Sequence, residues 1–167
     1  MLKTSEHHFR NSTYREKIVE HIFIGELLRY FWSAGLVNVE ILKPEVDSNG
    51  YDLVITYGMI VRHIQLKTSL SGSSTAKQNI NKNLANHISG CVIWIILEAD
   101  LSFQKFLWFG GSVGEKLPSL EYFSKSKHTR ANAEGVKKTR ENTVVLPKGA
   151  FTPLEGMDEL LLSLIHI

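Results

Sequence analysis

Residues 50–67 of this chain read GYDLVITYGMIVRHIQLK, and this stretch decides how the chain folds. Apolar and β-branched residues predict one strand at 51–56 and a second at 59–68. Tyr57 and Gly58 stand between them and have the chemistry of a tight turn. Because so few residues separate the two strands, we expect them to pair as an antiparallel hairpin.

The second strand of this hairpin carries polar residues on one face. Side chains alternate between the faces of a strand, so Gln65 and Lys67 point the same way, while Ile64 and Leu66 point the other way. Asp52 opens the first strand, and the hairpin should bring it alongside. One face is therefore predicted to be core, and the other to carry groups that could hold a metal ion and a phosphate.

Length and composition are those of an ordinary globular protein. The chain has 167 residues, of which 43% are hydrophobic and 22% are charged. Its length predicts a single domain, with a core at about 14–110 and a C-terminal elaboration at 111–167. The net charge is +2, from 19 basic and 17 acidic residues, so binding to nucleic acid would depend on local clusters of charge.

Cysteine usage and the N-terminal residues indicate the cellular compartment. Cys91 is the single cysteine, which excludes an intramolecular disulfide and a multi-cysteine zinc site. It lies in the apolar run 90–97, where a small buried side chain is the expected role. Residues 1–12 are polar and lack the apolar core of a signal peptide, and no run is long enough to span a membrane. We therefore expect a cytoplasmic protein with no membrane partner.

The spacing of apolar residues predicts the remaining elements. Helices are expected at 14–33, 75–88 and 156–165, and strands at 37–42, 92–97, 106–109 and 144–146. The prediction of the middle helix depends on four apolar residues that recur every four positions, Ala76, Ile80, Leu84 and Ile88. This order predicts an α/β fold with a mixed central sheet flanked by helices.

Asp52, followed by Gln65-Leu66-Lys67 after a hairpin, resembles the D...(D/E/Q)xK signature of the PD-(D/E)xK nuclease superfamily. The order of elements over residues 14–88 is similar to the αβββα part of that group, so the resemblance implies a restriction-endonuclease-like αβββαβ core. Tyr51 stands where the signature has proline, and neutral Gln65 stands where most members have an acid. The chain also resembles a group of uncharacterised bacterial proteins that carry Val-Asp-x-x-Gly-Tyr-Asp-Leu-Val and Arg-His-Ile-Gln-Leu-Lys, which brings no established activity.

The resemblance implies phosphodiester hydrolysis that depends on Mg2+ or Mn2+, with DNA as the expected substrate. Asp52 and Gln65 match the metal-binding positions of the signature, and the backbone carbonyl of Leu66 could complete the protein ligands. Lys67 matches the lysine that positions the attacking water and stabilises developing negative charge.

Several neighbouring residues are candidates for supporting roles. Many members of the superfamily add a glutamate from the first helix, and Glu26 is preferred over Glu20 because it interrupts an apolar stretch, where an acid needs a partner. Asp47 is either a further ligand or substrate contact, or a cap for the amides of its turn. His63 is either a proton acceptor or a structural hydrogen-bond partner, and His21 has the same two interpretations.

Basic residues gather in two places that could contact the backbone of nucleic acid. One is the polar face of the predicted helix at 75–88, and the other is the basic region at 125–140. The residues concerned are Lys77 and Lys82 in the first place, and Lys127, Arg130, Lys137 and Lys138 in the second. An ordinary solvated surface would have the same composition, so both interpretations stay open.

Other functions remain compatible with the sequence. Because Gln65 supplies no charge, a catalytically degenerate nuclease-fold module that binds nucleic acid or a partner protein is the main alternative. A toxin-like ribonuclease is a third. Small nucleases of this fold often form a homodimer to cut two strands, although no heptad or interface stripe in the sequence supports one.

Overall fold

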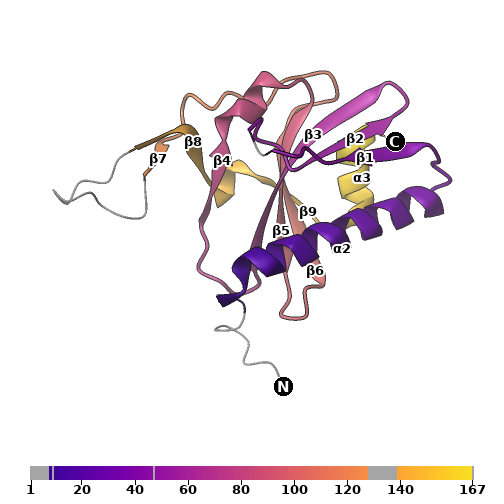
Figure 1. The fold of residues 1–167 in the computed structure, drawn as a ribbon, viewed down its shortest axis with the longest axis horizontal. Coiled ribbons are helices and arrows are strands. Elements are labelled where there is room, and N and C mark those ends of the chain that lie inside the picture. The colour runs from indigo at the N-terminus through magenta and orange to yellow at the C-terminus, as the bar shows by residue number, and fades with distance from the viewer. Residues whose placement is uncertain (1–7, 9, 47, 128–138, 167) are drawn as a thin grey trace.

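Most of the regular secondary structure in the described part of the chain is β-strand, and a long helix precedes the strands. The computed structural model describes residues 8, 10–46, 48–127 and 139–166. In chain order its elements are α2 (Ser12–Ser33), β1 (Val39–Leu42), β2 (Leu53–Tyr57), β3 (Ile60–Leu70), β4 (Lys77–Asn81), the 3-10 helix η1 (Lys82–Asn86), β5 (Gly90–Leu97), β6 (Phe103–Gly110), β7 (Lys125–Lys127), β8 (Thr139–Pro147), the 3-10 helix η2 (Lys148–Ala150), β9 (Thr152–Leu154) and α3 (Met157–Ile165) (Figure 1).

The central sheet has the strand order β1-β2-β3-β5-β6-β9. β2 and β3 form the predicted antiparallel hairpin, with Leu53 opposite Ile64 and Tyr57 opposite Ile60. β3 and β5 pair in parallel, whereas the other neighbours in this sheet are antiparallel. The predicted α/β class with a mixed central sheet is therefore confirmed.

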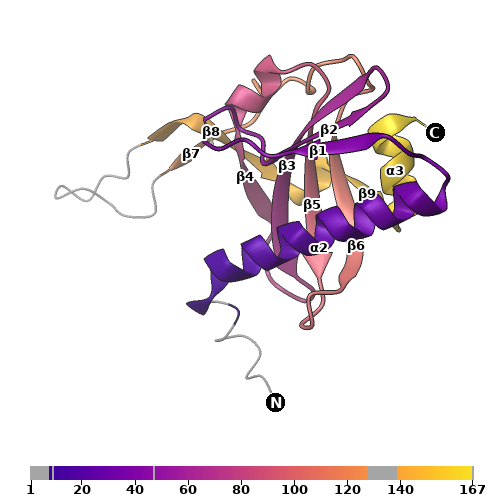
Figure 2. The same cartoon turned by 45° about the vertical axis from the view of Figure 1, so that its right-hand side comes forward.

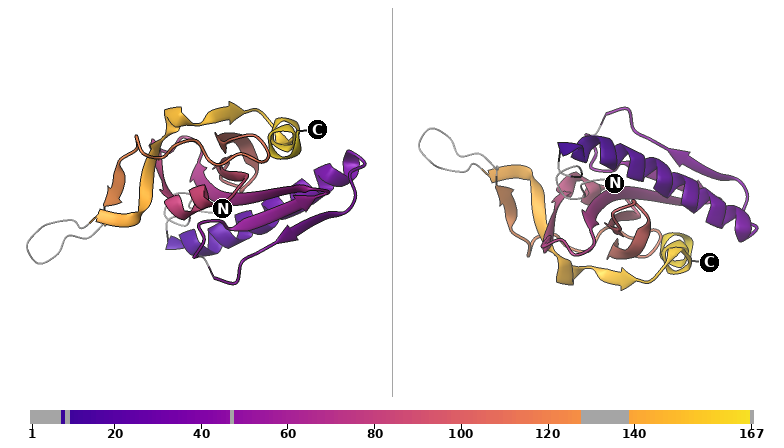
Figure 3. Two further views of the ribbon diagram at one scale, coloured as in Figure 1. Left: turned by 90° about the horizontal axis from the view of Figure 1, so that it is seen from above. Right: turned by 90° about the horizontal axis from the view of Figure 1, so that it is seen from below.

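α2 and α3 cover the same face of this sheet (Figures 2 and 3). The buried residues of α2 include Val19, Phe23, Leu27 and Phe31, which recur every four residues and so form one stripe along the helix. They share one core cluster with apolar residues of β2, β3, β5 and β6, and with most of α3. This packing fixes α2 against the hairpin, which brings its charged residues close to the hairpin's end.

A second, smaller sheet covers the opposite face. Its strand order is β4-β8-β7, and it shares an apolar cluster with η1, β5 and β6. Every residue of β5 is buried, because this strand is covered on both faces. That double burial explains why residues 90–97 are apolar throughout rather than alternating. β7 and β8 lie at the side of the molecule away from α3 (Figures 1 and 3).

The helix predicted at 75–88 is wrong, because β4 and η1 occupy this segment. Ile80 lies opposite Val144 of β8, and its side chain is buried in the second core cluster. Asn81 ends the strand and caps η1, where its side chain accepts a hydrogen bond from the N–H of Asn83 at 3.0 Å. Asparagine competes with the helical backbone for such bonds, so the asparagine-rich segment takes a strand partner instead.

The C-terminal part of the chain contains more strand than predicted. β8 extends well beyond the predicted 144–146, and neither β7 nor β9 was expected. β9 pairs with β6 and completes the central sheet, while α3 lies close to its predicted position. Among the described residues, no helix combines the length and apolar character needed to cross a bilayer.

Candidate functional site

Asp52 stands where the two strands of the hairpin separate. β2 begins at Leu53, whereas β3 continues past Ile64 without β2 as a partner. The N–H of Asp52 donates to the Ile64 carbonyl at 2.8 Å, and the N–H of Leu66 donates to Asp52 Oδ2 at 2.7 Å. Beyond the last paired residues of β2 and β3, the Asp52 carboxylate therefore accepts the N–H of β3 that a strand partner would otherwise accept, and this bond holds it against β3.

A backbone oxygen lies on the same side of β3 as this carboxylate. The N–H and C=O of one strand residue point to the same edge, so the Leu66 carbonyl faces the side on which its N–H meets Asp52. Thr68, two residues further, faces that edge too, and its carbonyl lies 3.5 Å from Nε2 of Gln78 in β4. This open edge of β3 thus presents oxygen atoms rather than a paired strand.

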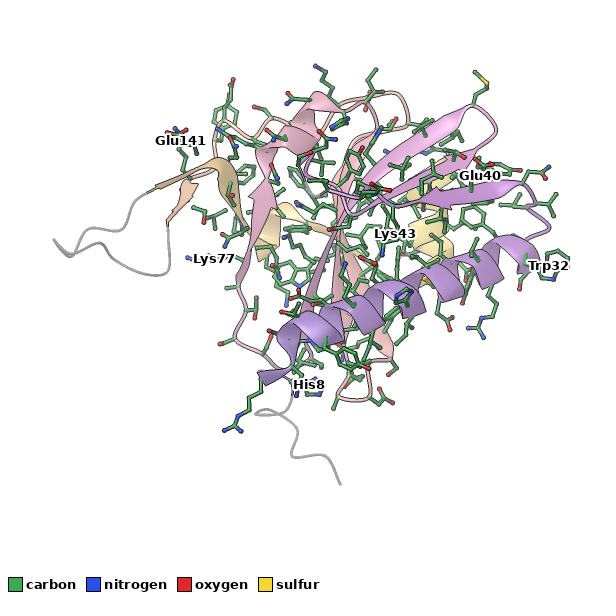
Figure 4. All side chains as sticks on the ribbon, in the orientation of Figure 1. His8, Trp32, Glu40, Lys43, Lys77 and Glu141 are labelled. Carbon is green, nitrogen blue, oxygen red and sulfur yellow. The ribbon has the colours of Figure 1, made fainter. Side chains whose placement is uncertain are left out.

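A cavity of about 620 Å³ lies along this edge. Its walls come from the hairpin, from the first half of α2 and from β4, and they carry three carboxylates and three lysines. The lining residues are Thr13, Glu16, Lys17, Val19 and Glu20 of α2, Asp52, Leu66, Lys67 and Thr68 of the hairpin region, and Lys77, Gln78 and Asn79 of β4. Figure 4 shows Lys77 on β4 and Lys43 beside the middle of α2.

Of the two glutamates predicted as candidates on the first helix, Glu20 lines this cavity, together with Glu16, whereas the preferred Glu26 does not. Glu20 is only 8% exposed and forms ion pairs with Lys43 and with Lys17, the second at 3.6 Å. Glu26 lines a different cavity and pairs with Arg29. Six residues turn a helix by about 240° beyond a full turn, so only one of the two glutamates can face the hairpin's end.

Gln65 and Lys67 differ in their surroundings. Gln65 is 6% exposed, and its Oε1 accepts a hydrogen bond from the N–H of Asn81 at 3.2 Å. It therefore ties β3 to the end of β4 and is not among the residues that line the cavity. Lys67 does line the cavity, together with Asp52. The structure thus brings Asp52, Lys67 and Glu20 to one place, whereas the buried Gln65 bonds to the backbone of Asn81.

The two histidines proposed for accessory roles lie away from this cavity's lining. His63 Nδ1 lies 3.1 Å from the carbonyl of Ile88 and must donate to it. Its ring packs against those of His87 and Tyr51, at centroid distances of 4.7 and 4.9 Å. Burial, and secondarily the charge of His63, lowers the pKa of His87. His21 is exposed on α2.

The residues predicted to contact nucleic acid are dispersed. Lys77 lines the cavity, as does Lys17, which sequence reasoning missed although it stands one helical turn before Glu20. Lys82 lines a second cavity, and Lys127 belongs to β7. Four candidates lie outside the described residues, namely Asp47, Arg130, Lys137 and Lys138.

The donor set at the first cavity fits a hard cation. Two of its three carboxylates, those of Asp52 and Glu20, and the Leu66 carbonyl offer oxygen atoms, which Mg2+ and Mn2+ prefer. Magnesium keeps several waters, so few protein ligands are needed. Within the described part of the chain, no group of three or more His, Cys, Asp or Glu side chains could hold a metal ion, so a backbone oxygen would have to contribute.

The chain has a distant structural likeness to a known protein. No protein-family model matches the chain, and no curated protein matches it. Among solved structures, the bacterial homing endonuclease I-Ssp6803I is similar, with a TM-score of 0.35 and 20% sequence identity. The match covers 56% of this chain and 61% of the endonuclease chain, which is less than two thirds of it. A likeness this low assigns no activity to the present chain.

Proposed function

We propose that this chain is a metal-dependent nuclease that hydrolyses phosphodiester bonds in nucleic acid, with DNA as the expected substrate. One observation carries the proposal. The Asp52 carboxylate, fixed by the Leu66 N–H at 2.7 Å, lines one cavity with Lys67 and Glu20. Carboxylate oxygens beside a lysine are what a site for a divalent cation and a phosphate requires.

Three oxygen donors would hold the cation, Mg2+ or Mn2+. They are the carboxylates of Asp52 and Glu20 and the backbone carbonyl of Leu66. The bound ion would polarise the phosphate and lower the pKa of a bound water. Lys43 and Lys17 hold Glu20 in the cavity by ion pairs, which fixes the orientation of its carboxylate.

The lysines would act on the substrate. Lys67 would stabilise the negative charge that develops on the phosphate oxygens as the bond breaks. Lys77, from β4, would neutralise a neighbouring phosphate and so position the nucleic-acid strand. Gln65 would act indirectly, because its bond to the Asn81 N–H keeps β4, and with it Lys77, beside the cavity.

Cleavage assays with matched variants test this proposal. Supercoiled, linear and branched DNA, and a single-stranded RNA, would be incubated with the protein and Mg2+ or Mn2+. We expect cleavage by the wild type and a loss of about 100-fold in Lys67→Ala and Asp52→Asn, the size seen when a charge-stabilising group is removed. Glu20→Gln should lose at least about tenfold, whereas its control Glu26→Gln should cleave like the wild type.

Two results would contradict the proposal. One is an inactive wild type on every substrate with both metals. The other is undiminished cleavage by Lys67→Ala. Equal losses in Glu20→Gln and Glu26→Gln would remove Glu20 from the ligand set and leave the remaining roles standing.

A binding module without catalysis is the second candidate, and two contacts favour it. Gln65 is neutral and its amide oxygen already accepts the Asn81 N–H, and Glu20 lies between two lysines that offset its charge. Both features weaken cation binding. Titration with Mn2+, followed by paramagnetic broadening of NMR signals near Asp52, distinguishes the two functions. No broadening, together with retained DNA affinity and no cleavage, would favour the module.

A further inference from the structure

A second cavity, of about 490 Å³, lies between η1, the segment 116–125 and β8. It shares no lining residue with the cavity at Asp52. Its volume is within the range of about 300–1000 Å³ that is typical of sites for small molecules. The sequence predicts no functional residue in the segment 116–124. It does predict Lys82 as a contact to nucleic acid, but on a helix at 75–88 that does not form.

The wall of this second cavity is apolar and includes an aromatic ring. Leu117 and Val144 are 7% and 5% exposed and belong to the second core cluster. Phe123 packs edge-on against Phe109, with ring centroids 6.1 Å apart and planes at 81°. Leu120 adds a further apolar surface. A flat ring system would bury its faces well against such a wall.

The same cavity carries an excess of positive charge. Lys82 comes from η1, Lys116 from the segment after β6, and Lys125 from β7, while Glu121 is the one acid in the lining. Among the residues that the structure describes, none of these lysines forms an ion pair. Three ammonium groups from three separate segments around one cavity attract an anion, and lysine is a common binder of phosphate groups.

Backbone hydrogen bonds hold the walls in place. The N–H of Ser89 donates to the Glu115 carbonyl at 2.6 Å, just before the segment begins. The N–H of Phe123 donates to Leu120 at 3.2 Å and closes a turn. The N–H of Val145 donates to Ser124 at 2.8 Å, which ties the segment to β8. A preformed cavity loses little conformational freedom on binding.

From the apolar wall and the three lysines we infer that this cavity binds a phosphorylated nucleoside. The base would lie against Phe123, Leu120 and Leu117, and the phosphate would lie among the lysines. The ligand would be a free mononucleotide or one unpaired nucleotide of a single strand, since both have this chemistry. The site needs no reaction at Asp52, so it stands independently of the nuclease activity proposed above.

Chemical-shift titrations of the 15N-labelled chain of 167 residues test this inference. The ligands would be 5′-dAMP, deoxyadenosine, inorganic phosphate and a single-stranded oligodeoxynucleotide. We expect 5′-dAMP to shift the amides of Leu117, Leu120 and Phe123, and deoxyadenosine to bind at least about tenfold more weakly, because it lacks the charged group. Lys116→Ala should weaken 5′-dAMP about fivefold or more. The control Lys105→Ala removes a lysine of β6 that lines neither cavity and should bind like the wild type.

Each outcome decides a point. Tighter binding of the oligonucleotide than of 5′-dAMP at the same amides supports the site and assigns it to a strand, whereas equal or weaker binding assigns it to the free nucleotide. Three results would each overturn the inference. They are shifts of these amides by phosphate as large as those by 5′-dAMP, no shift with any ligand at millimolar concentration, and full affinity of Lys116→Ala for 5′-dAMP. Asp52→Asn should keep its affinity for 5′-dAMP, which separates this site from the proposed nuclease site.

Discussion

Arg62 joins the hairpin to the C-terminal helix, and its replacement should destabilise the fold strongly. The residue is fully buried in β3, on the face opposite Gln65. Its guanidinium donates to the carbonyls of Leu164 and Ser163 at 2.8 Å each, and to that of Gly111 at 3.0 Å. Two of these carbonyls lie in the last turn of α3, where helical carbonyls lack partners and the helix dipole is negative.

The expected loss follows from these contacts. A hydrogen bond from a charged donor contributes about 1.5 kcal/mol at the lower end of its range, so three of them contribute about 4.5 kcal/mol. Arg62→Met keeps much of the apolar stem but leaves three carbonyls without this donor. Relief from burying a charge offsets part of the loss, so we expect the free energy of unfolding to fall by about 3 kcal/mol.

Urea and thermal unfolding, followed by circular dichroism, measure this loss. For a domain of this size, about 3 kcal/mol corresponds to a decrease in Tm of roughly 6–12 °C. Arg62→Lys should recover part of the stability, because one ammonium can still donate to the end of α3. A free energy of unfolding for Arg62→Met within about 1 kcal/mol of the wild type would refute the reasoning, since the buried bonds would then contribute no more than the cost of burying the charge.

Three further predictions concern single residues. Gly50→Ala should destabilise the protein by about 2 kcal/mol or more, because Gly50 has a φ of +82° and an added Cβ would lie 2.9 Å from the Leu84 nitrogen. Its control is Gly58→Ala. Gly58 has a φ of +58° but open space around it, so this change should lower the free energy of unfolding in urea by only about 1 kcal/mol. Burial raises the pKa of Cys91 to about 12 from 9.0, so the free energy of unfolding should fall by about 1.4 kcal/mol per pH unit between these values, a slope that Cys91→Ala should lack. His87 should titrate below 6.5 by NMR, and His63→Gln should raise its pKa only part of the way, because burial is the larger cause of the shift; a midpoint at or above 6.5 in the wild type would contradict this.

The parts of the fold that the sequence predicts depend on residues close together along the chain. The two-residue period of 59–68 and the turn at Gly58 are sufficient for the hairpin, and the four-residue stripe of α2 is sufficient for the helix and its buried face. The same local periods predict that Gln65 and Lys67 share a face and that Asp52 reaches the hairpin's end. When one face of a hairpin is apolar, a shift of the strand register by one residue would expose that face to solvent, so the short turn and the apolar face together specify one register.

The remaining features depend on contacts between distant segments. The period-four pattern at 75–88 fits a helix, but β8 supplies a strand partner from the far end of the chain, and a local pattern carries no information about such a partner. Glu20 faces the cavity instead of Glu26 because the packing of α2 on the sheet fixes the helix's rotation. The second cavity exists because η1, β7 and β8 meet there. The sequence by itself thus determines the hairpin and its polar face, whereas only the tertiary structure decides which charges surround that face, because rotation and strand pairing are set by the packing of the whole core.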